Sequence, residues 1–406
     1  MMKRRSFLVG ASALTLGQLV SGCNSQQDSL KVRILKDSLP PQLRDEFHKI
    51  LKKPATLKFD IEAQLQDLFK SLQTWKQEGA ESKTEGQRTL PFIENFPLIG
   101  KKKPALANLV TLGDYWLEKA IRQQLIQPLN IENLKGWQQL PRPWQEIVKR
   151  NRQGQLDKSG QVWGAPYRWG TTVIAYNRDK LKEQKLEPPK DWSDLWNLKF
   201  RGRISLLDQP REVIGLTLKK LGLSYNTVDL SQVKDLEKEL LNLHQQVKFY
   251  SSNNYLQPLI LGDTYVAVGW STDILATASS YRQIEAIVPR SGTALWADLW
   301  VQPASSGTSG ANSVETGEGQ SLVQQWIDFC WKSKPAQEIS LFSNATSPII
   351  LSTNSADLPK DLRENRLRLP DASVLNKSEF LKPLPDSSIE QYKQLWEKIR
   401  LSKISR

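Results

Sequence analysis

The chain has 406 residues and a formal net charge of +13, with 39% hydrophobic and 24% charged residues, a composition typical of globular proteins. At roughly 150 residues per domain this length predicts two or three domains, and the presence of only two Cys and two His excludes a disulfide scaffold, a zinc finger and an iron–sulfur cluster. The positive charge is dispersed, with its tightest run at Lys101-Lys102-Lys103, so we expect no nucleic-acid partner.

The first 22 residues have the organisation of an export signal. A Lys-Arg-Arg run at 3–5 precedes an apolar stretch over 7–20, which is shorter than the roughly 20 residues that a membrane-spanning helix needs. The paired arginines resemble a twin-arginine signal, and the Val-Ser-Gly that precedes Cys23 resembles a bacterial lipobox. We therefore predict a signal peptide over 1–22, lipidation of Cys23 and a polar, lipid-anchored tether over 23–29.

Strand and helix patterns alternate along the first half of the mature chain. Residues 79–104 break this rhythm, because they are rich in Gly, Pro and charge, and they predict a long loop or insertion. The elements that we expect are strands over 30–35, 55–61 and 106–112, helices over 41–51, 62–77 and 115–124, and a strand-rich segment over 162–177.

A second series of the same kind follows. A capped helix is expected over 191–198, with Asp191 as N-cap and Asp194 three residues later. Residues 305–319 are rich in Ser and Gly and predict a loop. The other expected elements are strands over 203–207, 265–270 and 284–288 and helices over 211–221, 231–243, 321–333 and 389–404. Two alternating series indicate an α/β protein with two lobes.

Sequence motifs of the common enzyme classes are missing. The sequence contains no phosphate-binding P-loop, no G-x-G-x-x-G after a strand, no G-x-S-x-G and no H-E-x-x-H. His48 and His244 both lie on expected helices, where a structural role is the default. We therefore expect no catalytic residues, no cofactor and no metal site.

Aromatic and carboxylate side chains gather instead near two expected strands. Trp270 ends the strand over 265–270, and Trp296 and Asp298 lie two residues apart in an extended segment, so they share one face. A carboxylate beside a Trp ring suits an organic ammonium, because it supplies charge while the ring adds a cation–π contact of roughly 0.5–2 kcal/mol. The pattern predicts a cation site, with core packing as the alternative for each Trp.

A series of motifs between Trp163 and Pro303 has a distinctive order and spacing. These are Pro166-Tyr167-Arg168-Trp169-Gly170-Thr171-Thr172, Trp192-Ser193-Asp194-Leu195-Trp196, Arg211-Glu212-Val213, Gly269-Trp270 and Trp296-Ala297-Asp298-Leu299. The series resembles the spermidine/putrescine-binding proteins of bacterial ABC transporters, although 79–104 has no counterpart there. The resemblance implies a type II periplasmic binding protein fold, in which two lobes, each a mostly parallel sheet flanked by helices, close on a ligand in the cleft between them. It implies one lobe over 30–172 and 297–353, and a second over 173–296 and 354–406.

The resemblance also implies the ligand-binding residues. Asp298 and Glu212 would each hold one ammonium, while Trp270, Trp296 and Tyr115 would line the methylene spacer between them. Trp169, in the motif nearest the expected crossing between the lobes, would join them in the cleft.

Two stacking aromatic residues of the family are replaced here by Leu35 and Ser38. Because neither side chain can stack on a ligand, we expect weaker binding than in a protein with the complete aromatic wall.

These observations together predict a periplasmic solute-binding lipoprotein, anchored to the outer face of the cytoplasmic membrane. We expect a monomer that binds a linear polyamine or related organic cation and passes it to an ABC permease and its ATPase. Two alternatives stay open. If Arg168 faced the cleft, an amino acid, another zwitterion or an organic anion would be favoured, and a blocked cleft would favour a sensory or structural surface lipoprotein.

Overall fold

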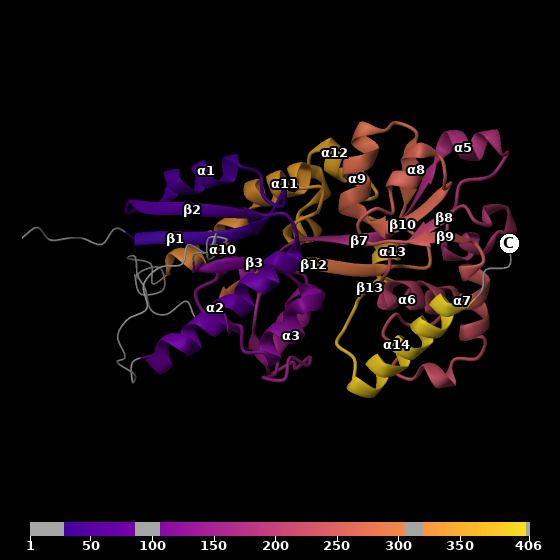
Figure 1. Ribbon diagram of the computed structural model, residues 1–406. Coiled ribbons are helices and arrows are strands. Elements are labelled where there is room, and N and C mark those ends of the chain that lie inside the picture. The colour runs from indigo at the N-terminus through magenta and orange to yellow at the C-terminus, as the bar shows by residue number, and fades with distance from the viewer. Residues whose placement is uncertain (1–27, 86–105, 305–319, 403–406) are drawn as a thin grey trace, which may run out of the picture.

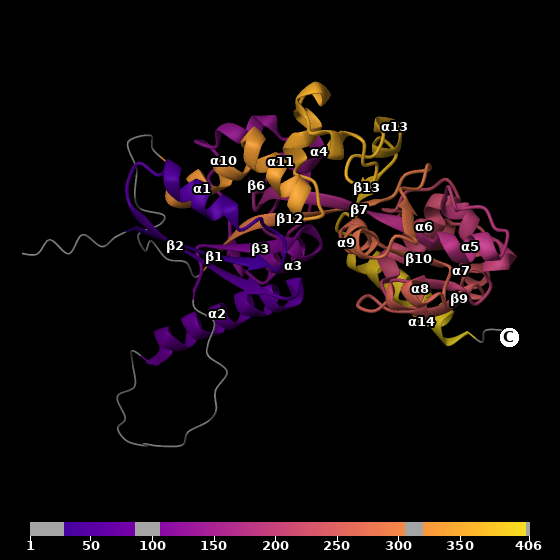
Figure 2. The ribbon, with the colours of Figure 1, turned by 90° about the horizontal axis from the view of Figure 1, so that it is seen from above.

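The computed structural model describes residues 28–85, 106–304 and 320–402. Two lobes lie side by side, and two long strands, β7 (Ala165–Asn177) and β12 (Ala294–Pro303), run from one into the other (Figures 1 and 2). The predicted two-lobed α/β architecture is confirmed. The predicted signal peptide, Cys23 and the expected loop over 305–319 lie outside the described residues.

One sheet path links the two lobes through these crossing strands. Its order is β2-β1-β3-β12-β7-β10-β8-β9, with β1 parallel to β2 and β3, and with β8 parallel to β9 and β10. Along this path the crossing strands are antiparallel to their neighbours, so each lobe has a parallel outer part and an antiparallel inner part. The remaining bounds are β1 Asp28–Leu35, β2 Ala55–Glu62, β3 Leu109–Gly113, β8 Ile204–Leu206, β9 Val247–Tyr250 and β10 Val266–Trp270. Short strands complete the set: β4 Ile126–Gln127, β5 Lys149–Arg150, β6 Gln161–Val162, β11 Ile284–Ile287 and β13 Glu379–Phe380.

Helices cover both faces of the sheet in each lobe, because parallel strands must be joined by crossover connections that pack back onto the sheet (Figure 1). The first lobe carries α1 Gln42–Ile50, α2 Leu65–Glu85, α3 Leu117–Arg122, α4 Arg142–Val148, α10 Leu322–Cys330, α11 Ser333–Phe342 and α12 Lys360–Arg363. The second carries α5 Arg178–Glu183, α6 Pro210–Lys220, α7 Leu236–His244, α8 Gln257–Leu261, α9 Ser271–Ser280 and α14 Asp386–Leu401. The short helix α13 Ala372–Leu375 lies in the chain between α12 of the first lobe and α14 of the second. No helix in the described parts of the chain has the length and hydrophobicity needed to cross a membrane.

The hydrophobic core is divided between the lobes. One cluster of buried residues is drawn from 30–169 and 295–380, and a second from 174–294 and 384–399. Leu358, Leu362 and Phe380 pack in the first cluster, whereas the lobe boundary that we predicted places 354–406 in the second lobe. The packing therefore favours a return to the second lobe near Leu384, and the other predicted lobe boundaries stay a prediction.

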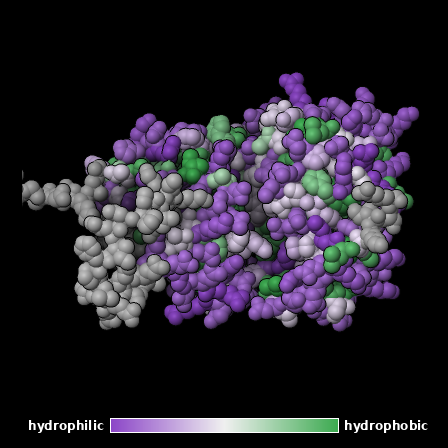
Figure 3. Space-filling view, in the orientation of Figure 1, coloured by the Kyte–Doolittle hydropathy of each residue, from purple (hydrophilic) through white to green (hydrophobic). Residues whose placement is uncertain are grey.

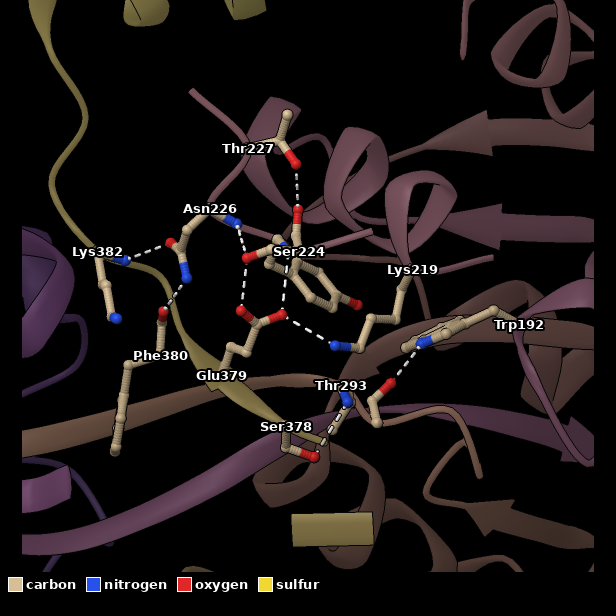
Figure 4. Close-up of polar contacts among 12 residues, drawn as sticks. Trp192, Lys219, Ser224, Asn226, Thr227, Thr293, Ser378, Glu379, Phe380 and Lys382 are labelled. Carbon is tan, nitrogen blue, oxygen red and sulfur yellow. Dashed lines mark hydrogen bonds and ion pairs between the residues drawn. The ribbon is translucent and has the colours of Figure 1, made fainter. Parts of the chain in front are cut away.

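A short segment around Glu379 fastens the second lobe to the first (Figure 4). The Glu379 carboxylate accepts hydrogen bonds from Lys219 Nζ at 2.9 Å, Ser224 Oγ at 2.5 Å and the backbone N–H of Tyr225 at 3.1 Å, all in the second lobe. The next side chain, Phe380, packs edge-on against Trp144 of the first lobe, with ring centroids 5.3 Å apart. The segment therefore contacts both lobes close to their junction.

Three predicted boundaries are wrong for local reasons. The helix expected over 62–77 runs from Leu65 to Glu85, because 80–85 consists largely of good helix formers that follow the isolated Gly79. The tether expected over 23–29 ends earlier, since Asp28 already pairs with Ala55 in the sheet. The helix expected from 231 begins at Leu236, after Asp235 in the left-handed region at φ 64°.

Candidate ligand site between the lobes

The central part of β7 brings four of the expected site residues together, Asp298, Trp296, Trp270 and Glu212. Asp298 and Trp296 of β12 lie opposite Arg168 and Gly170 of β7, and Trp270 of β10 lies opposite Thr172 on the other side. Side chains of directly paired residues point to the same face of a sheet, so residues distant in sequence meet here. In the space-filling view the largely hydrophilic surface is hollowed between the two lobes (Figure 3).

Trp296 lies directly over a glycine. A Cβ at Gly170 would lie 2.3 Å from Trp296 Cζ2 and 2.5 Å from Ser271 Oγ, distances that no real Cβ tolerates. Ser271 begins α9 of the second lobe, and its hydroxyl accepts a hydrogen bond from Thr171 N at 3.1 Å. Gly170 therefore allows an aromatic ring of β12 and the first residue of α9 to approach β7 closely.

Glu212 is a buried carboxyl group in the first turn of α6, with 6% of its surface exposed. Its two carboxyl oxygens lie 3.1 and 3.0 Å from Thr172 Oγ1, which donates the hydrogen bond. Burial raises the pKa of Glu212 to about 7, and hydrogen bonds from Thr172 and Trp270 and the charge of Arg211 offset that only in part. Within the described parts of the chain no ion pair involves Glu212, so its charge lacks a close counter-ion there.

Asp114, on the first lobe, is a second buried carboxyl group with a raised pKa. Asp114 Oδ1 accepts a hydrogen bond from Ala297 N at 3.0 Å, and burial raises the pKa of Asp114 to about 7, with a smaller contribution from Asp298 and an opposing one from Arg150. The sequence reasoning missed Asp114, although its position directly after a buried strand and before Tyr115 was a usable signal. Tyr115 itself is 60% exposed, so its ring is accessible.

Asp298 is already paired with a cation of the protein itself. Arg168 Nε donates to Asp298 Oδ2 at 2.7 Å, and Arg168 Nη2 lies 2.7 Å from the same oxygen. A further Arg168 N–H donates to the backbone oxygen of Ser343 at 3.1 Å. The two side chains are only 5% and 3% exposed, so their opposite charges compensate each other inside the protein.

The backbone of Trp270 is hydrogen-bonded to Tyr255, a residue that the sequence analysis did not predict for the site. The Tyr255 hydroxyl donates to Asp273 Oδ2 at 2.9 Å and accepts from Trp270 N at 3.2 Å. A Cβ on Gly269 would lie 1.9 Å from the Tyr255 ring, so that glycine permits the ring to pack against β10. Burial raises the pKa of Asp273, which adds a third carboxyl group that is costly to ionise near the junction.

Comparison with known proteins now identifies the family. A model of the bacterial extracellular solute-binding proteins matches residues 105–378. The chain belongs to this family. Its members are solute-binding proteins, not a class of enzymes.

Proteins with known ligands are similar to most of the chain. A spermidine/putrescine-binding periplasmic protein of Haemophilus influenzae is 25% identical over 73% of this chain and 75% of its own, and a putrescine/cadaverine-binding protein of Pseudomonas aeruginosa is 27% identical over 61% and 70%. A solved spermidine/putrescine transporter substrate-binding protein of Streptococcus pneumoniae superposes with a TM-score of 0.71 at 19% identity, covering 92% of this chain and 99% of that one. The type II periplasmic binding protein fold expected from the sequence is therefore confirmed.

Trp169 is the predicted site residue that the structure does not bring to this group. Because side chains alternate along a strand, Trp169 points away from the face that carries Arg168 and Gly170. It is buried, and its ring packs edge-on against Trp144, with centroids 5.1 Å apart. Of the two family positions that lack an aromatic residue, Leu35 is half-buried against the first core and Ser38 is fully buried.

Proposed function

We propose that this family member binds a linear polyamine or a related organic cation outside the cytoplasm and delivers it to an ABC permease and its ATPase. The observation that carries the proposal is Glu212, a buried carboxyl at the lobe junction without a close counter-ion among the described residues. A ligand ammonium beside Glu212 would supply that counter-ion and would remove the cost of ionising a buried carboxyl.

The aromatic side chains around Glu212 support the same ligand class. Trp270 and Trp296 flank the central part of β7, and the accessible ring of Tyr115 lies on the first lobe. An ammonium gains a cation–π contact from such rings, and a methylene chain gains an apolar surface. The names of the relatives, which specify putrescine, spermidine or cadaverine, point to linear amines of this kind.

Isothermal titration calorimetry with putrescine, cadaverine and spermidine tests the proposal. The protein is expected to bind at least one of them, and Glu212→Gln is expected to weaken that binding by about tenfold or more, because the ligand loses its charged partner. Glu239→Gln is a matched control, since Glu239 pairs with Lys220 on the side of the lobe occupied by α7. Absence of heat with all three amines, together with binding of an amino acid or organic anion, would contradict the proposal.

We also propose that the protein is held at the membrane by lipid on Cys23, after export by the twin-arginine route. The sequence of 1–23 supports this proposal, through its Arg pair, short apolar stretch and small residues before a lone Cys. Metabolic labelling with a fatty-acid analogue should mark the wild type and not Cys23→Ala. Equal labelling of both would reject it.

A further inference from the structure

Arg168 and Asp298 form a buried ion pair within the candidate ligand site. Two acidic side chains, Glu212 and Asp298, lie near Trp270 of β10 and Trp296 of β12. Of these two, only Glu212 lacks a close cation within the described chain. We propose that Arg168 is a specificity-determining residue whose guanidinium takes the place of a ligand ammonium on Asp298, so that the site favours amines with one ammonium over diamines of equal length. The inference rests on the proposed function, in which Glu212 holds an ammonium.

The guanidinium is fixed too firmly to be displaced by a small ligand. It makes three polar contacts, two to Asp298 Oδ2 and one to the backbone oxygen of Ser343. Arg168 lies within β7, directly paired with Asp298 of β12 and next to the bridge between Trp169 and Thr346, and not on a loop that could swing away. An ammonium that replaced it would have to leave a buried guanidinium without its counter-ion, which is costly.

The charge of Arg168 also reaches the second lobe. It lowers the pKa of Asp273 on α9, although burial outweighs this effect and leaves that pKa raised. A second ligand ammonium that approached this part of the junction would therefore be repelled by Arg168, and the Asp298 carboxylate would already be neutralised by that same guanidinium. An uncharged, hydrogen-bonding end of the ligand meets no such repulsion.

Asp114 does not provide a second carboxylate for a ligand ammonium. Its carboxyl is directed to the backbone N–H of Ala297 and has Arg150 as an electrostatic partner inside the first lobe. Arg150 is itself buried and donates to the backbone oxygens of Ile147 and Gly154. Glu212 is therefore the carboxylate on which an ammonium would gain most.

Two four-carbon probes test this inference by calorimetry: putrescine, which has two ammonium groups, and 4-amino-1-butanol, which has one. The wild-type protein is expected to bind 4-amino-1-butanol at least as tightly as putrescine. Arg168→Met frees Asp298 and should raise the affinity for putrescine by about tenfold or more, with little change for 4-amino-1-butanol. Adding Asp298→Asn to that variant should remove the gain, because the gain depends on the carboxylate and not on the space created.

Arg33→Met is the control, because Arg33 is a buried arginine of the same lobe that pairs with Glu62 and Ser71. It should leave the ratio between the two probes unchanged. Tighter binding of putrescine than of 4-amino-1-butanol by the wild type would overturn the inference even if the Arg168 variants did not fold. An equal loss of affinity for both probes in Arg168→Met would overturn it as well. If the wild type bound cadaverine or spermidine but neither probe, this inference would fail while the proposed function stood. If it bound none of these amines, the proposed function would fail first, and this inference with it.

Discussion

Replacing Glu212 by Gln should make the unliganded protein more stable at neutral and higher pH while making it a poorer amine binder. Gln is uncharged and of nearly the same shape, so it can keep a hydrogen bond to Thr172 without the cost of a buried charge. The substitution therefore separates the charge of Glu212 from its packing.

The magnitude follows from the pKa of Glu212, which burial raises from an ordinary 4.5 to about 7. At about 1.4 kcal/mol per pH unit, that difference corresponds to about 3 kcal/mol. The folded protein holds this proton more tightly than the unfolded chain, so the contribution to stability is fully present below pH 4.5. It is lost as the pH rises from 4.5 through about 7, so that above this range the fold is about 3 kcal/mol less stable than below it.

Urea denaturation of the wild type and Glu212→Gln between pH 4.5 and pH 8.5 measures this difference directly. The free energy of unfolding of the variant, relative to that of the wild type, should increase by about 3 kcal/mol across the range. Other titrating groups, Asp114 among them, are common to both proteins and cancel in the comparison. Parallel stability curves for the two proteins would refute the reasoning.

Amine binding should show the complementary behaviour. A proton and a ligand ammonium compete for the Glu212 carboxylate, so the affinity of the wild type should rise as the pH increases through about 7. The affinity of Glu212→Gln should be lower and nearly independent of pH over the same interval.

Two further substitutions test the geometry around the site. Gly170→Ala should displace the Trp296 ring, because the new Cβ would lie 2.3 Å from Trp296 Cζ2; we expect a loss of about 1–3 kcal/mol in stability and a shift in Trp fluorescence, and unchanged emission would contradict the close approach. Glu379→Gln should cost about 1–2 kcal/mol, because Lys219 and Ser224 lose a charged acceptor; a melting temperature equal to that of the wild type would show that this contact does not hold the junction.

Most of the secondary structure could be predicted from local patterns. The strands over 30–35 and 55–61 and the helix over 211–221 were placed to within a few residues, because alternation, helical periodicity and the helix-ending Gly222 are properties of the neighbouring sequence alone. The capping pair Asp191 and Asp194 was also recognised correctly, and the structure forms both of its hydrogen bonds.

The candidate site was predicted in part. The i, i+2 spacing of Trp296 and Asp298 placed both on one face of a strand, and the sheet register confirms that arrangement. Spacing within one segment does not show which residues of a neighbouring strand lie opposite it. The ion pair between Arg168 and Asp298 and the position of Gly170 opposite Trp296 therefore could not be deduced from the spacing. The orientation of Trp169 was mistaken for the same reason, because the face of β7 that reaches the junction depends on the strands beside it.

The sequence by itself determined the alternation of strands and helices, the family and the kinds of side chain at the junction. These depend on local periodicity and on motifs with fixed order and spacing. Only the tertiary structure decided which carboxyl groups are compensated: the register between β7 and β12 gives Asp298 a guanidinium, and the packing of α6 leaves Glu212 buried beside Thr172. Charge compensation depends on distances between segments far apart in the chain, and these distances exist only once the sheet has formed.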